Sequence, residues 1–110
     1  MNKIIDAQLE AYKKLDVDDM MQYFHADIEM FHLSTNQRTD AGLDNVRIKY
    51  KNFFEKSPNL KFKLINRMMF HEFVVDHESL HGFLNKAESV EALVVYQLEG
   101  EKIRRVWIGM

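Results

Sequence analysis

The segment 8–31 constrains the fold most, because two helical patterns and an alternating strand pattern follow one another there with almost no loop. Apolar residues recur at three- and four-residue spacing in the first of them, at Ile5, Leu9, Tyr12 and Leu15. This stripe is typical of a helix lying on a core, and Gln8 falls on it. Asp16 and Asp18 favour the end of this helix and the start of a second, whose apolar face we predict from Met20, Met21 and Phe24.

A strand pattern follows over residues 26–33. Side chains alternate between the two faces of a strand, so Ile28, Met30 and His32 share one face. His32 therefore takes a position that the periodicity assigns to an apolar residue.

The remaining chain predicts one more helix and then only strands. The polar stretch 34–42 indicates a loop, with the helix beginning near Thr39 or Asp40 and ending before Pro58, the only proline. Strands are predicted at roughly 60–71, 74–84, 88–98 and 102–108. Their short connections favour an antiparallel meander, and the helices must then gather on one side of it. We expect an α+β fold in a single domain, 1–110, with three helices from the N-terminal half closing a pocket.

Composition excludes several classes of partner and site. The chain has 110 residues, a formal net charge of -2 and no cysteine. Charged residues of both signs are interspersed, so we expect no nucleic-acid partner and no membrane surface. Disulfides and thiolate chemistry are excluded, and we find no cofactor motif, signal peptide or membrane-spanning stretch. The expectation is a cytoplasmic domain without cofactor or metal.

The last two predicted strands carry apolar residues on both faces. Ala92, Val94 and Tyr96 share one face, whereas Leu93 and Val95 share the other. Helices cover only one side of such a sheet. The second apolar face predicts a homodimer formed through the outer face of the sheet, the alternative being a few exposed side chains.

In this order, the segments LDVDDMMQYF, LKFKLINRMMF, VVDHESLHG and IRRVWIG resemble the NTF2-like superfamily and, within it, the SnoaL-like group. The resemblance covers essentially the whole chain. It implies a cone-shaped, curved, mostly antiparallel sheet of the cystatin-like kind, helices closing its wide end, a deep pocket and frequently a dimer. Members include steroid isomerases, polyketide cyclases, dehydratases and plain ligand-binding scaffolds, so the resemblance alone does not decide function.

The ketosteroid isomerases have the best-understood site in this superfamily. When this sequence is aligned with their pattern, the position of their tyrosine donor corresponds to Gln8, that of their aspartate base to His32, and that of their protonated aspartate to the region of Val94. None of these three positions is matched. The steroid chemistry is therefore not carried over.

Two polar residues on otherwise apolar faces are the candidate catalytic groups. An imidazole in an apolar pocket resists protonation, so His32 could act as a base, and Gln8 or Tyr12 could donate a hydrogen bond to the substrate. Alternatively, the histidine is a hydrogen-bonded structural residue and Gln8 satisfies a backbone carbonyl. Met30, Val94 and Tyr96 are predicted to line the same pocket.

A second polar group lies on the predicted hairpin of strands 60–71 and 74–84. Arg67 should reach Asp76 or Glu78 across it. An ion pair is the first interpretation. If the group faces the pocket, one of the carboxylates could instead bind substrate or act as a base.

The sequence HESLH, residues 77–81, matches the H-E-x-x-H signature of zinc peptidases. That signature requires a helix, where residues four apart lie about 6 Å from one another. Val74, Val75 and Gly82 favour a strand instead, on which the two histidines stand roughly 13 Å apart. We therefore predict no metal site.

Two hypotheses follow. The first is a pocket protein that binds a small apolar organic molecule and acts on it as a cofactor-independent isomerase, cyclase or dehydratase by proton transfer. The second is a non-catalytic dimeric binding or scaffold module.

Overall fold

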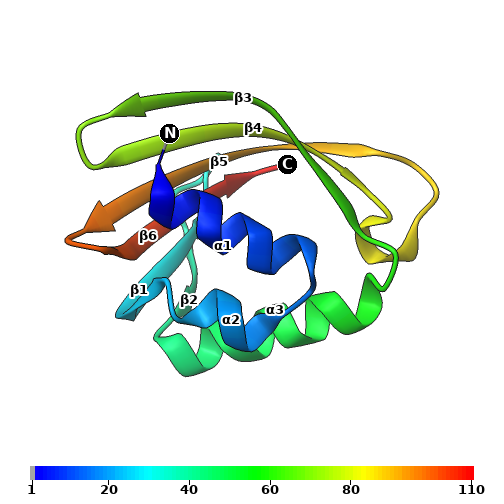
Figure 1. Ribbon diagram of the computed structural model, residues 1–110, viewed down its shortest axis with the longest axis horizontal. Coiled ribbons are helices and arrows are strands. Elements are labelled where there is room, and N and C mark those ends of the chain that lie inside the picture. The colour runs from blue at the N-terminus through cyan, green and yellow to red at the C-terminus, as the bar shows by residue number, and fades with distance from the viewer. Residues whose placement is uncertain (1) are drawn as a thin grey trace.

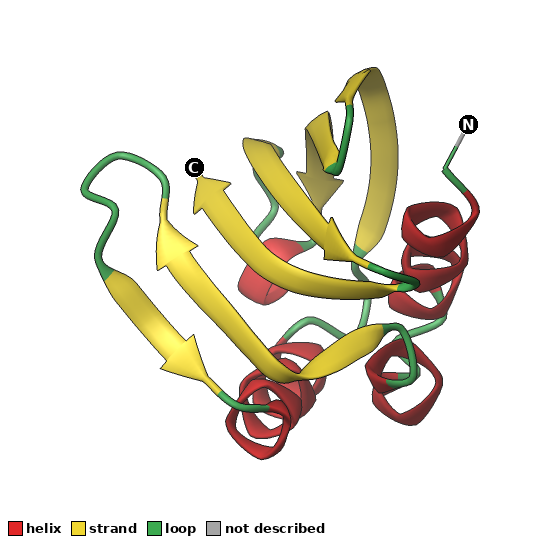
Figure 2. Cartoon of the chain, turned by 90° about the vertical axis from the view of Figure 1, so that its left-hand side faces the viewer, coloured by secondary structure: helices red, strands yellow, loops and turns green. Residues whose placement is uncertain are grey.

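The computed structural model describes residues 2–110 as three α-helices, one short 3-10 helix and a six-stranded sheet. The helices are α1 (Lys3–Lys13), α2 (Val17–Met21), α3 (Leu43–Lys56) and η1 (Phe83–Asn85). The strands are β1 (Phe24–His32), β2 (Arg38–Ala41), β3 (Lys61–Phe70), β4 (Phe73–His81), β5 (Val90–Glu99) and β6 (Lys102–Gly109). Figures 1 and 2 show a strongly curved sheet with the α-helices gathered on one side. The predicted α+β architecture is confirmed.

Local sequence explains where the first helices begin. The side chain of Asn2 accepts hydrogen bonds from the backbone N–H groups of Ile4 and Ile5, which have no partner within α1. Asp16 caps α2 in the same way, accepting from the N–H of Asp19 at 3.0 Å. The predicted end of the first helix and start of the second helix near Asp16 are confirmed.

The sheet has the order β2-β1-β6-β5-β4-β3. β3 to β6 form the predicted antiparallel meander, whereas β1 joins β6 in parallel. The parallel pair sets Met30 opposite Val106 and His32 opposite Ile108. Residues far apart in the chain therefore meet in the middle of the sheet.

Three boundaries predicted from sequence are wrong. The expected loop 34–42 contains the edge strand β2, which pairs with β1. α3 begins after Gly42, whose φ of +89° suits glycine, and not near Thr39 or Asp40, which lie in β2. Phe24 opens β1 and does not belong to α2. The pairing of β2 with β1 sets the boundaries in this region. The sequence does not reveal them, because β2 is short and polar and carries no periodic apolar signal.

None of the helices in the described part of the chain is long and apolar enough to cross a membrane.

Candidate functional site

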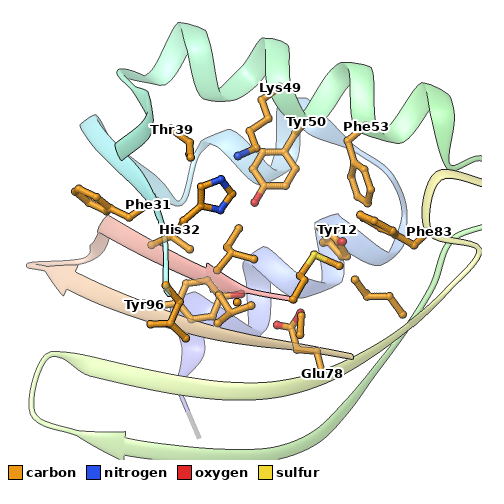
Figure 3. Close-up of a pocket in the computed structure, with 18 of the residues that line it drawn as sticks. Tyr12, Phe31, His32, Thr39, Lys49, Tyr50, Phe53, Glu78, Phe83 and Tyr96 are labelled. Atoms are coloured by element: carbon orange, nitrogen blue, oxygen red, sulfur yellow. The ribbon is translucent and has the colours of Figure 1, made fainter. Parts of the chain in front are cut away.

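A cavity of about 520 Å³ lies between the helices and the curved inner face of the sheet. Figure 3 shows α3 along one side of it and the sheet along the other. Its wall is mostly apolar, with side chains that include Leu9, Phe24, Phe53, Leu80, Phe83, Ala92, Val94, Val106 and Ile108. A cavity of this size and lining is typical of sites for small organic molecules.

Six of the predicted site residues line this cavity: Gln8, Tyr12, His32, Glu78, Val94 and Tyr96. The helix stripe and strand alternation bring them together from α1, β1, β4 and β5. Three others, Met30, Arg67 and Asp76, do not line it. Met30 is only 1% exposed and belongs to the core where α3 packs on β1.

Arg67 and Asp76 form the ion pair predicted across the hairpin. The guanidinium donates from Nε to Asp76 Oδ1 at 2.6 Å and from Nη2 to Oδ2 at 2.9 Å. Its Nη1 donates to Asp6 of α1 at 2.6 Å. α1 thereby closes over the pair, and Asp76 is completely buried. The arginine is committed to two carboxylates, so this cluster ties α1 to the sheet beside the cavity.

Glu78 is the one carboxyl group of the hairpin that faces the cavity. It shares the inner face of β4 with Asp76 and is only 5% exposed. Burial, reinforced by the nearby Asp76 charge, raises the pKa of Glu78 to about 8, although the Tyr96 hydroxyl and Arg67 act in the opposite direction. Glu78 is therefore mostly a neutral carboxylic acid at pH 7.

Three tyrosines line the cavity: Figure 3 shows Tyr12 and Tyr96 on either side of this carboxyl group and Tyr50 nearer to Lys49. Burial raises the pKa of each, and the Glu78 charge adds to the effect. Their hydroxyls therefore stay protonated at neutral pH and can donate hydrogen bonds.

Two buried oxygens at this site lack protein partners. Within residues 2–110, Gln8 Oε1 and Glu78 Oε2 are the buried side-chain oxygen or nitrogen atoms without a hydrogen bond. Both residues line the cavity. Leaving a buried polar atom unpaired costs about 1–3 kcal/mol, so these two atoms mark the place where a ligand's polar group would be stabilised.

His32 lies at the mouth of the cavity and is exposed. His32 does not occupy the buried position that the strand pattern predicted, because it is the last residue of β1 and is exposed there. The pairing of β1 with β2 also shifts register between Met30 and Phe31. The exposed lining residues that form this mouth are His32, Ser34, Thr39 and Met110, with half-buried Lys49 beside them.

The HESLH stretch is a strand, as predicted, and its two histidines belong to the outer face. His77 Nε2 lies 2.5 Å from Glu91 Oε1, and His81 Nδ1 lies 3.1 Å from the Ser89 hydroxyl. Glu78 points to the opposite face, into the cavity. The residues of this motif therefore do not converge on one point.

Sequence reasoning missed Lys49, Thr39 and the hydroxyl of Tyr50 as parts of the site. Lys49 was not among the residues predicted to line the pocket. The spacing 46, 49, 50 and 53 places it on the same side as the apolar stripe, and this signal could have found it. Thr39 was assigned to a loop.

The profile of the SnoaL-like domain matches residues 5–106. The chain belongs to the SnoaL-like family. No curated protein matches the sequence of this SnoaL-like domain significantly.

Solved structures share its fold at low sequence identity. An uncharacterised cystatin-fold protein from Novosphingobium aromaticivorans is 20% identical, with 96% of this chain and 94% of that chain covered and a TM-score of 0.86. A SnoaL-like protein of unknown function from Burkholderia thailandensis is 16% identical, with 94% and 87% covered and a TM-score of 0.78.

A third structure, from Catenulispora acidiphila, is a protein with a ketosteroid isomerase-like fold in complex with trimethylamine. It is 13% identical, with 96% and 83% covered and a TM-score of 0.79. Other neighbours are named as candidate polyketide cyclases and a candidate ketosteroid isomerase. At these identities the likeness establishes the fold, and the function has to be argued from the cavity.

Proposed function

We propose that this SnoaL-like domain binds a small, largely apolar organic molecule in the cavity and catalyses a proton transfer on it, as a cofactor-independent isomerase, cyclase or dehydratase. The observation that carries the proposal is Glu78, a buried carboxyl group whose Oε2 lacks a partner in an apolar cavity. A general acid or base needs a pKa near the working pH, and the pKa of Glu78, about 8, meets that need.

The proton-transfer step follows from the two states of Glu78. As a carboxylate it takes a proton from a carbon next to a carbonyl group. As a carboxylic acid it returns that proton to another carbon, or gives it to a departing hydroxyl group. A tyrosine hydroxyl of the cavity would hold the carbonyl oxygen as negative charge develops on it. His32, at the mouth, would relay protons to solvent, and the amide of Gln8 would orient the polar end of the substrate.

Replacement of Glu78 with glutamine is expected to abolish carbon-proton exchange. The test uses 1-phenylbut-3-en-1-one, a β,γ-unsaturated ketone, in D2O, with deuterium uptake and isomerisation followed by NMR. We expect the rate to fall about 10²–10⁴-fold in Glu78→Gln, because a positioned base contributes that much. The wild-type rate should rise with pH up to about 8, since abstraction needs the ionised form.

Glu101→Gln is the matched control, because Glu101 is exposed on the turn between β5 and β6. It should retain the wild-type rate. Equal exchange in wild type and Glu78→Gln would remove Glu78 from the mechanism. Stoichiometric binding of the ketone without any exchange would favour the second function, a non-catalytic binding module, which the largely apolar lining also suits.

The outer face of the sheet supports a further part of the proposal, a homodimer. Strand register aligns apolar side chains in one row across five strands: Phe31, Trp107, Val95, Val75 and Met68. Phe31 and Trp107 stack at 5.2 Å, and Met68 is 65% exposed. We define this row as the outer stripe. A second copy of the chain, related by a two-fold axis, would cover the stripe and leave Glu29, Arg105 and Gln97 of a neighbouring row at the rim.

Val95→Glu is expected to convert a dimer into a monomer. Val95 lies at the centre of the outer stripe, where a charge would be buried without a partner. Light scattering after size exclusion gives the mass. Ile48→Glu is the control, because Ile48 is 57% exposed but lies on α3. A monomeric wild type would contradict the proposed dimer.

A further inference from the structure

The neutral polar groups and the basic groups that line the cavity are separated along its length. Glu78 and Tyr96 lie at the sheet side, whereas Lys49 and His32 lie at the opposite side near the mouth (Figure 3). Between them the wall is mostly apolar, with the Tyr50 side chain among the apolar groups. A molecule that fills the cavity therefore meets a neutral hydrogen-bonding end at depth and a basic end at the entrance.

Lys49 is only partly committed to its protein partner. Its Nζ donates to Asp40 Oδ2 at 2.8 Å. Asp40 does not line the cavity but lines a separate, polar depression between β2 and α3, and Lys49 lines both. An ammonium group has three N–H donors, so two remain after this bond. Figure 3 shows the amine directed into the cavity beside Tyr50.

We propose that the ligand is an amphipathic carboxylic acid, with its carboxylate at Lys49 and His32, its apolar body in the cavity and a polar group toward Glu78. This inference rests on the proposed function and narrows its substrate class. Lysine binds a carboxylate through charge-assisted hydrogen bonds, which are stronger in a partly buried site than in water. Imidazole N–H of His32 can add a further donor. A neutral apolar ligand would gain nothing from either residue.

The competing explanation is structural, since the Lys49–Asp40 ion pair also joins α3 to β2. Two substitutions separate these explanations because both break the same pair. Lys49→Gln removes the cation that would bind the ligand. Asp40→Asn leaves this cation and removes the carboxylate that competes for it. If the ion pair is only structural, both variants should change the ligand affinity in the same direction. If Lys49 binds the ligand, Lys49→Gln should weaken binding and Asp40→Asn should strengthen it.

The test measures dissociation constants for 1-naphthaleneacetate and the neutral 2-(1-naphthyl)ethanol at pH 7.5 by calorimetry. Wild type should bind the acid at least tenfold more tightly than the alcohol. Lys49→Gln should lose about tenfold in acid affinity and leave the alcohol unchanged, and Asp40→Asn should bind the acid more tightly. Lys51→Gln, an exposed α3 residue outside the cavity, should match wild type.

Several outcomes would overturn the inference. Equal binding of acid and alcohol by wild type would do so, as would equal losses for both ligands in Lys49→Gln. In either case the alcohol still binds, and the proposed apolar-ligand function survives. Failure of wild type to bind either naphthyl compound would count against the proposed function as well.

Discussion

Replacing Arg67 with methionine is expected to lower the free energy of unfolding by about 3–5 kcal/mol. Asp76 is completely buried, and Arg67 supplies both hydrogen bonds that its carboxylate makes. Methionine leaves the Asp76 carboxylate buried without a partner. The free-energy cost of this unpaired charge is far larger than the net stabilisation that the ion pair provides. Asp6 loses its contact as well, so α1 is no longer tied to the sheet at this point. Urea unfolding at pH 7 measures the change.

Two variants serve as controls for this result. Arg38→Met removes an arginine that is 58% exposed and paired with Glu29, so the loss should stay below about 1 kcal/mol. The double variant Arg67→Met with Asp76→Leu removes both buried charges and should recover most of the stability. A smaller loss in Arg67→Met than in Arg38→Met would show that the cluster does not hold the fold together.

The stability of the protein is expected to fall between about pH 4.5 and pH 8 because of Glu78. Its pKa is about 8 in the fold and 4.5 in an ordinary environment. Below pH 4.5 both folded and unfolded chains carry the proton, and the contribution is fully present. As the pH rises to 8, the unfolded chain ionises while the fold holds the proton, so stability is lost. The loss is on the order of 5 kcal/mol at about 1.4 kcal/mol per pKa unit.

Glu78→Gln should remove this pH dependence, since glutamine is uncharged in both states. The variant should match wild type near pH 4 and exceed it by several kcal/mol at pH 9, as urea unfolding would measure. Glu101→Gln, on an exposed turn, should keep the wild-type profile. Parallel profiles for wild type and Glu78→Gln would contradict the raised pKa. Higher stability of Glu78→Gln would also show that its expected loss of exchange activity is not caused by unfolding.

Most of the fold was predictable because its helices and long strands carry strong periodic patterns. The stripe through Ile5, Leu9 and Tyr12 predicted the buried side of α1, and the short connection between the strands predicted at 88–98 and 102–108 predicted the last hairpin. β2 was not predicted, because its sequence, RTDA, is short and polar. It lies at the sheet edge and is held by pairing with β1 alone, which only tertiary structure reveals.

The candidate site was harder to predict because alternation places a residue on a face without giving its depth. His32 shares the face of Met30, yet one is exposed at the strand end and the other is buried. Asp76 and Glu78 also share a face, but only Asp76 is bound by Arg67, which also binds Asp6, whereas Glu78 faces the cavity. These differences arise from contacts between elements far apart in the sequence, and a single sequence does not display them.

The parallel pairing of β1 with β6 also affects how the domain folds, because it joins segments that lie far apart in the sequence. Val106 and Ile108 of β6 complete the cavity wall opposite residues contributed by α1 and α3. A partly folded chain in which β6 has not yet paired leaves this edge of β1 exposed. Such long-range closure slows folding and extends the period in which aggregation competes. The cavity therefore forms only once β1 and β6 have paired.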